Sequence, residues 1–202
     1  AAGAVNVLYG SSGGLTATGN QVWSQDSPGV ANITQPRDLF GSALAAGDFN
    51  ADGRAELAVG VPGETFDDPP SFIAEHGVVH VLVGSPGGLT GTGSQLWSQD
   101  SAGIADQAED GDRLGSALAT GDFNGDGPAD LAMGAPGENL NSGFGSGVVH
   151  VLAGSGAGLT ATGSQLWSQD SPGVAGAPEF LDDLSVVRES LLHHGGERTA
   201  GG

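Results

Sequence analysis

The sequence predicts an all-β fold built from repeated four-stranded units, and two observations support this. First, the block Gly84 to Ser101 (GSPGGLTGTGSQLWSQDS) matches Gly154 to Ser171 at 15 of 18 positions, and Gly10 to Ser27 is a third copy. Second, the 202 residues include 38 Gly and 10 Pro, which argues against long helices. Because hydrophobic residues still make up 38%, the chain is neither collagen-like nor starved of core residues.

The repeat has a period of about 70 residues. Trp23, Trp97 and Trp167 occupy the same place in the three copies, at intervals of 74 and 70 residues. The difference arises in one loop, which spans 14 residues from Gly63 to Gly77 and 10 residues from Gly137 to Gly147. The remainder of each unit therefore keeps a constant length.

Each unit contains four candidate strands separated by glycine-rich turns. In the first complete unit these are residues 41–49, 56–62, 77–84 and 94–100. The third candidate, GVVHVLVG, is apolar on both faces of its pleat, as expected for a strand between neighbouring sheets. Four strands per unit predict β-propeller blades of four antiparallel strands.

The repeat divides the chain into four parts. We expect the C-terminal half of one blade at 1–35, complete blades at 36–100 and 101–177, and a non-repeat tail at 178–202. The tail has apolar residues at helical spacing, with Gly195 as a C-cap. It is therefore either a short amphipathic helix docked on the blades or disordered, non-native sequence left by truncation.

The charge of the chain excludes several functions. Asp and Glu number 24 against 5 Arg and no Lys, which gives a net charge of −19. Such a chain repels nucleic acid and anionic membrane surfaces, and no apolar run approaches the ~18 residues of a membrane span. The absence of Lys and Cys removes Schiff-base, phosphate-loop and thiol chemistry. We therefore expect no nucleic-acid partner and no membrane insertion.

Two acidic loops, 48–56 and 122–130, have the pattern of a site for a hard cation. Side-chain oxygens stand at positions 1, 3, 5 and 9, and Gly53 or Gly127 at position 6 allows the chain to turn sharply. The carbonyl at position 7, from Arg54 or Pro128, completes the set. The side-chain ligands are Asp48, Asn50, Asp52 and Glu56 in the first loop and Asp122, Asn124, Asp126 and Asp130 in the second.

Calcium fits these loops better than the alternatives. An EF-hand requires Glu at position 12, where this sequence has Val59 or Met133 within an apolar strand. Mg²⁺ prefers to keep several waters, and Zn²⁺ prefers His or Cys. A merely polar turn would explain one loop, but two copies that keep all four ligand positions favour metal. We therefore expect two Ca²⁺ ions, one per loop.

The run from Phe40-Gly41 through the acidic loop to Gly60-Val61-Pro62 resembles an FG-GAP repeat. The second copy has Leu114-Gly115 in place of Phe-Gly and a complete Gly134-Ala135-Pro136. Such repeats build the seven-bladed β-propeller of integrin α chains and recur in secreted bacterial proteins. The resemblance implies that the acidic loops are the family's Ca²⁺ sites. The ligands it implies are Asp48, Asn50, Asp52, Arg54 and Glu56, and Asp122, Asn124, Asp126, Pro128 and Asp130.

Three functions are consistent with this resemblance. The first is a calcium-binding module, secreted or on the cell surface, that binds an extracellular protein or glycan in adhesion. The second is an accessory propeller region of a secreted hydrolase, similar to that of GPI-specific phospholipase D, and the third is a structural spacer. No constellation outside the metal loops supports catalysis, so we expect no enzyme activity in this chain.

Two and a half blades do not close a propeller, which requires at least about four. We therefore expect either a fragment of a larger propeller or open blade edges that are capped by self-association, by another chain or by the tail.

Two weaker patterns favour structural roles. His80 and His150 lie at equivalent places inside candidate strands, where a packed residue is more common than a catalytic base. The segment Gly10 to Gly14 (GSSGG) matches a nucleophile elbow, but its copies lack the serine, so a hairpin turn is expected.

Overall fold

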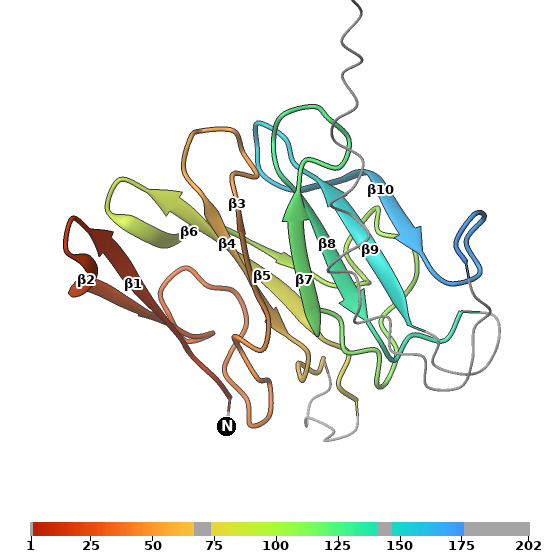
Figure 1. Ribbon diagram of the computed structural model, residues 1–202. Helices are drawn as coiled ribbons and strands as arrows, with labels where there is room; N and C mark the ends of the chain where they lie inside the picture. Colours follow the sequence, from red (N-terminus) through yellow and green to blue (C-terminus); the bar gives the residue numbers. More distant parts are fainter. Residues whose placement is uncertain (1, 67–73, 141–146, 176–202) are drawn as a thin grey trace, which may run out of the picture.

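The computed structural model describes residues 2–66, 74–140 and 147–175, and these form an all-β structure without helices (Figure 1). Within the described residues no helix is long and apolar enough to cross a membrane. The predicted tail at 178–202 lies outside them. The strands are β1 (Val5–Ser11), β2 (Gly14–Trp23), β3 (Leu44–Gly47), β4 (Glu56–Val61), β5 (Val78–Ser85), β6 (Gly88–Trp97), β7 (Ala117–Gly121), β8 (Asp130–Ala135), β9 (Val148–Ala153) and β10 (Thr160–Trp167).

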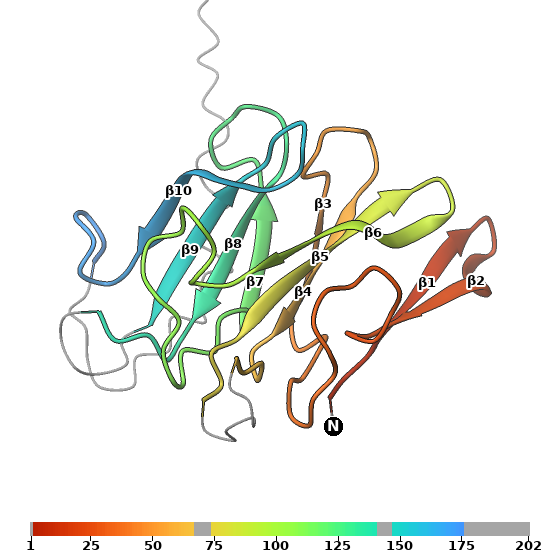
Figure 2. The ribbon, with the colours of Figure 1, turned by 180° about the vertical axis from the view of Figure 1, so that it is seen from behind.

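The strands form three antiparallel sheets in chain order: a hairpin of β1 and β2, a middle sheet β3-β4-β5-β6 and a last sheet β7-β8-β9-β10. Seen from behind, the three follow one another across the molecule (Figure 2). The innermost strands β3 and β7 lie side by side. The four-stranded antiparallel sheets confirm the predicted fold of partial propeller blades.

The observed strands differ from the predicted ones mainly at their ends. The first predicted strand, 41–49, shortens to β3 because Gly41 has a φ of 90° and Asp48 already belongs to the acidic loop. The fourth starts earlier than predicted and ends at Trp97, where a serine turn begins. In that turn the Ser98 backbone N–H donates to Ser101 Oγ at 2.9 Å. The predicted hairpin turn at Gly10 to Gly14 joins β1 to β2.

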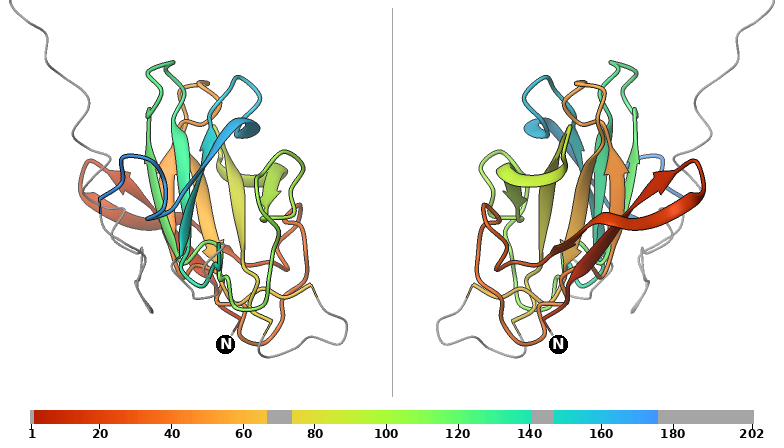
Figure 3. Two further views of the ribbon diagram at one scale, coloured as in Figure 1. Left: turned by 90° about the vertical axis from the view of Figure 1, so that its right-hand side faces the viewer. Right: turned by 90° about the vertical axis from the view of Figure 1, so that its left-hand side faces the viewer.

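Each pair of neighbouring sheets encloses its own apolar core. The side views of Figure 3 show the middle and last sheets lying against one another. On β5, Val78 and Leu82 pack toward the hairpin, whereas Val79 and Val81 pack toward the last sheet. Both faces of this strand are therefore buried, as its sequence predicted. The larger core contains Phe49, Ala58, Val79, Val81, Leu114, Leu131, Met133, Ala135, Val148, Leu152 and Leu159.

The sheets approach one another most closely at paired glycines. A Cβ added to Gly60 of β4 would lie 2.0 Å from the carbonyl oxygen of Gly115, which precedes β7. Nearby, Gly77 forms an isolated parallel bridge with Leu114. The Gly60-Val61-Pro62 segment of the first complete unit therefore meets the Leu114-Gly115 segment of the second, where the two sheets pack together.

Glutamines at one place in the repeat fix the spacing at the outer edge. Gln95 of β6 donates from Nε2 to the Leu159 carbonyl at 2.9 Å, and the Leu159 N–H donates to Gln95 Oε1 at 3.0 Å. Gln21 of β2 makes the same two bonds to the backbone of Leu89, each at 2.9 Å. One side chain therefore satisfies both backbone groups of a residue in the next sheet.

Candidate functional site

The two acidic loops occupy equivalent places and lie at the same end of their sheets (Figure 1). The first connects β3 to β4 and is closed by the pair Gly47 and Glu56. The second connects β7 to β8 and is closed by Gly121 and Asp130. The repeat therefore presents the same chemistry twice on neighbouring inner hairpins.

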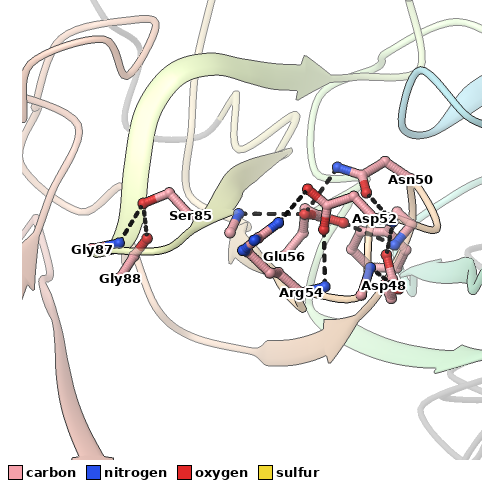
Figure 4. Close-up of polar contacts among 11 residues, drawn as sticks. Asp48, Asn50, Asp52, Arg54, Glu56, Ser85, Gly87 and Gly88 are labelled. Carbon is pink, nitrogen blue, oxygen red and sulfur yellow. Dashed lines mark hydrogen bonds and ion pairs between the residues drawn. The ribbon is translucent and has the colours of Figure 1, made fainter.

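In the first loop the side chains at positions 1, 3 and 5 turn back onto the backbone of the loop (Figure 4). Asp48 accepts from the backbone N–H of Asp52 at 3.1 Å and from that of Gly53 at 2.9 Å. Asn50 Oδ1 also accepts from the Asp52 N–H, and Asp52 Oδ1 accepts from the Arg54 N–H, both at 2.9 Å. These local bonds hold the three side chains in one turn.

The second loop repeats this arrangement. Asp122 Oδ1 accepts from the N–H groups of Gly125 and Asp126, at 2.7 and 3.1 Å, and its Oδ2 accepts from Gly127 at 3.1 Å. Asn124 Oδ1 accepts from the Asp126 N–H at 2.8 Å. The turn is therefore a property of the repeated sequence rather than of one location.

The acid at position 9 anchors each loop to its sheet. Glu56 is 3% exposed, and its carboxylate accepts from the N–H groups of Phe49 at 2.8 Å and Gly84 at 3.3 Å. Asp130 bonds in the same way to the backbone of Phe123 and Gly154. Burial raises the pKa of Glu56, the bonds from Gly84 and Phe49 oppose this, and the charges of the two loop aspartates add to the rise.

The loops differ at position 7. The guanidinium of Arg54 lies 3.4 Å from Asp52 Oδ2, and both side chains are well exposed. Pro128 at the equivalent place has no charge. The first loop thus carries a positive charge beside the carboxylate at position 5, whereas the second loop does not.

Sequence reasoning did not identify a second acidic group, which the structure assembles between the sheets. Glu109, Asp112 and Glu138 each offer one carboxylate oxygen, and these three oxygens lie within 4.8 Å of one another. Within the described residues, neither acidic loop brings three carboxylates this close together. These residues come from the segment before β7 and the turn after β8. We call this place the second junction, and it comprises Gln99, Asp106, Glu109, Asp112 and Glu138.

The first junction is the equivalent place between the hairpin and the middle sheet, 74 residues earlier. Gln25 donates from Nε2 to the buried Glu64, as Gln99 donates to Glu138 at 2.6 Å. The other members are Asn32, Gln35 and Asp38. Comparing the two units position by position would have revealed the acidic changes, Asn32 to Asp106 and Gln35 to Glu109.

Burial perturbs the carboxyl groups of both junctions. It raises the pKa of Glu64 to about 7, with the charge of Asp38 contributing, and that of Glu138 to about 8, with the charges of Asp112 and Asp106 contributing. Asp112 also has a raised pKa, mainly through burial. These acids lie in the contact between sheets, where water is excluded.

The two strand histidines are packed, as the sequence predicted. His80 is 0% exposed, and its ring lies 5.7 Å from that of Phe40, centroid to centroid. Burial lowers the pKa of His80 and of His150 to about 4. Both are therefore neutral parts of the core at neutral pH.

Comparison with known proteins agrees with this architecture. The FG-GAP repeat family matches residues 40–75 and 114–152. The chain is 36% identical to the Drosophila melanogaster integrin alpha-PS2 over 152 residues and 35% identical to the rat phosphatidylinositol-glycan-specific phospholipase D over 123 residues. The mouse integrin alpha-IIb is 33% identical over 146 residues.

These relatives are much longer than this chain. The matched regions cover 74%, 61% and 68% of this chain, respectively, but only 10%, 14% and 12% of the three relatives. The chain therefore spans only a small part of each relative. The segments that match the family contain β3, β4, β7, β8 and both acidic loops, and the chain is an FG-GAP repeat protein related to the integrin alpha chains.

Proposed function

We propose that the chain is a calcium-binding FG-GAP β-propeller module in which residues 1–35 form the C-terminal half of one blade and residues 36–100 and 101–177 form complete blades. One Ca²⁺ binds in each acidic loop and stabilises it. The observation that supports this most is shared by both loops: the side chains of positions 1 and 3 accept hydrogen bonds from the backbone N–H of position 5. The proposed ligands are Asp48, Asn50, Asp52, the carbonyl of Arg54 and Glu56, and Asp122, Asn124, Asp126, the carbonyl of Pro128 and Asp130.

The donor set of the loops fits a hard cation. All side-chain donors are carboxylate or amide oxygens, and Ca²⁺ takes six to eight such ligands at about 2.3–2.6 Å. Asp48 and Asp122 already orient their carboxylates through backbone bonds, so little ordering is needed when the ion binds. Because the Arg54 guanidinium competes for Asp52, the second loop is the tighter site.

We further propose that the module acts outside the cell or on its surface. Extracellular loops of this kind bind Ca²⁺ with Kd of about 10⁻⁴–10⁻³ M, a concentration that the cytosol does not reach. Its role there is to bind a protein or glycan ligand rather than to catalyse a reaction, and the open blade edges allow self-association or capping.

The similarity to a phospholipase D favours one alternative, an accessory propeller region beside a catalytic domain elsewhere in a longer protein. A further alternative is a structural spacer. The remainder of the gene product separates these: a neighbouring hydrolase domain favours the accessory role, and a surface anchor favours adhesion or a spacer. A binding screen against glycans and matrix proteins then separates adhesion from a spacer.

Calorimetric titration with Ca²⁺ of the full chain, after treatment with a chelator, tests the loop sites. Asp126→Ala is expected to remove the tighter Ca²⁺-binding step, and Asp52→Ala is expected to remove the weaker one. Asp170→Ala, which removes the same charge at an exposed position outside the loops, leaves both events intact. Equal preference for Mg²⁺, or loop variants that bind Ca²⁺ as the parent does, would contradict the proposal.

A further inference from the structure

We propose that the second junction is an additional Ca²⁺ site, located between the middle and last sheets and separate from the acidic loops. Its ligands are Glu109, Asp112 and Glu138, with Gln99 Oε1 as a further oxygen donor and the charge of Asp106 beside them. The three carboxylates belong to the last unit, and Gln99, from the turn after β6, would tie the ion to the middle sheet.

The geometry of the carboxylates suits a single ion. One oxygen from each of Glu109, Asp112 and Glu138 lies within 4.8 Å of the other two. Oxygens that share one Ca²⁺ at about 2.3–2.6 Å are at most about 5 Å apart. Three carboxylates and the Gln99 amide oxygen, together with bidentate contacts or water, reach the coordination number that Ca²⁺ requires.

A buried oxygen without a donor, on a residue outside the acidic cluster, also points to a missing ligand. Gln99 is 1% exposed, and its Nε2 donates to Glu138 at 2.6 Å, so its Oε1, on the same amide carbon, lies beside the cluster. Gln99 Oε1 accepts no hydrogen bond from any described residue. Asp112 Oδ1 accepts none either, although the carboxyl groups of Asp112 and Glu138 share a hydrogen bond when one of them is protonated. Asp106 Oδ2 likewise accepts no hydrogen bond from any described residue. Since buried oxygens are normally satisfied, these atoms are suited to a cation.

The charge of the junction also requires compensation. Four carboxyl groups gather there, and the chain contains no Lys. Arg113 pairs with Glu75, and His76 lies 3.4 Å from Asp110. His150 lies near Asp106, but burial lowers the pKa of His150 to about 4, so at neutral pH it supplies no positive charge. A bound divalent cation would offset the repulsion among the carboxylates directly.

The first junction provides an internal comparison. It has the same buried pair, Asp38 and Glu64, and Gln25 Oε1 also lacks a donor. However, Asn32 replaces Asp106 and its amide bonds to Glu64, while Gln35 replaces Glu109. Two fewer carboxylates and one additional amide donor leave the first junction less suited to a divalent ion. The proposal is therefore specific to the second junction.

The test uses the full chain with both acidic loops disabled by Asp52→Ala and Asp126→Ala, titrated calorimetrically with Ca²⁺. This loop-disabled chain is expected to bind one equivalent of Ca²⁺. Adding Asp106→Asn and Glu109→Gln, which gives the second junction the residues of the first, is expected to abolish that equivalent. Asn tolerates the positive φ of 87° at position 106, and Glu109 is exposed, so this variant is expected to fold.

The outcomes separate this site from the loop sites. An intact chain that binds two ions and a loop-disabled chain that binds none would overturn the junction site and leave the loop sites standing. That result is also expected if Asp112 and Glu138 share a proton instead of binding a metal ion, because Ca²⁺ would then not bind at the junction. If the intact and loop-disabled chains each bind one ion that the junction substitutions abolish, the junction stands and the loop sites fail. If the loop-disabled chain still binds Ca²⁺ after the junction substitutions, the proposed junction site is wrong.

Thermal unfolding gives a second readout. In EDTA, the chain with Asp106→Asn and Glu109→Gln is expected to melt at a higher temperature than its parent, because two uncompensated charges are gone. In saturating Ca²⁺ this advantage is expected to disappear, since only the parent gains from binding at the junction. If the two carboxylates had only a structural role, the substitutions would lower the melting temperature in both conditions, which would contradict the proposal.

Discussion

At the scale of single residues, glycines decide how closely the sheets pack. Gly60 contacts Gly115 of the next sheet, and a Cβ at Gly60 would lie 2.0 Å from the Gly115 carbonyl oxygen. Gly134 is the same residue of the following unit, but a Cβ there would lie 3.5 Å from its nearest neighbour, Ala117 Cβ. The same motif glycine is thus sterically required in one unit and not in the other.

We expect Gly60→Ala to destabilise the chain by about 2–3 kcal/mol, because the new methyl group must push two backbones apart. Gly134→Ala, the matched control, is expected to change stability by less than about 1 kcal/mol, because its Cβ makes ordinary contacts. Neither glycine has a positive φ, so the comparison isolates packing from backbone strain. Urea unfolding measures both, and equal losses would contradict this explanation.

A second residue-scale prediction concerns the pH dependence from Glu64. Burial, with the charge of Asp38 contributing, raises its pKa from the ordinary value of 4.5 to about 7. Between these values the folded chain keeps a proton that the unfolded chain has lost, so stability falls as pH rises through this window. His80 and His150 have lowered pKa values, so their contribution to stability increases as pH rises.

Glu64→Gln therefore has to be compared with the parent at each pH. The melting temperature of the parent relative to Glu64→Gln is expected to fall between pH 5 and pH 7 and to level off above. Both proteins retain the two histidines, so their contribution cancels in the difference. A difference that does not vary with pH would show that the proton at Glu64 does not contribute to stability.

At the scale of elements, one glutamine in each of β2 and β6 binds the backbone of the next sheet. Gln95 of β6 satisfies both backbone groups of Leu159, which directly precedes β10. At the equivalent place in β10, Gln165 accepts instead from Trp167 Nε1 at 2.8 Å, and this side chain is exposed. The tryptophan at one place in the repeat is also more exposed in the last copy, with 8% of its surface exposed at Trp23 and 42% at Trp167.

Gln95→Ala is expected to cost about 1–3 kcal/mol, because it leaves the N–H and C=O of Leu159 without partners in a largely buried contact. Gln165→Ala is expected to cost less than about 0.5 kcal/mol, because water replaces its exposed bond. Chemical denaturation of the two variants measures the difference. Similar losses at the two positions would mean that Gln95 acts within its own sheet rather than between sheets.

At the scale of the whole molecule, acidic charge is the main opposing force. The net charge is −19, and each acidic loop gathers three carboxylates. Repulsion among them disfavours the compact state unless cations or protons compensate. Because the loops lie on adjacent inner hairpins of the middle and last sheets, the ions proposed there would act on the same part of the fold.

We expect Ca²⁺ to raise the melting temperature of the chain by several degrees. At a tenfold excess over Kd, each site contributes about 1.4 kcal/mol, since Ca²⁺ binds the folded loop and hardly the unfolded chain. Asp126→Ala is expected to remove the share of the second loop. Scanning calorimetry with Ca²⁺ and with EDTA measures both effects. Unchanged melting in EDTA, together with loss of ligand binding, would mean that the ions contact a ligand instead.

The sequence by itself determined the features that depend on neighbours along the chain. The repeat period, the strand pattern of β4 and β5 and the turn in each acidic loop follow from spacing over a few residues, because their hydrogen bonds are local. The loop ligands and their metal remain predictions. The ends of β3 and β6 were missed because a positive φ at Gly41 and a serine turn decide them.

Only the tertiary structure decided which residues meet between sheets. Gln99 and Glu138 are 39 residues apart in sequence, and packing of the last sheet on the middle one brings them within 2.6 Å. The close approach of Gly60 to Gly115 arises in the same way. Spacing within one unit carries no information on such contacts, because they depend on how far one apolar sheet face settles onto the next. That distance is set by the packed core rather than by any local pattern.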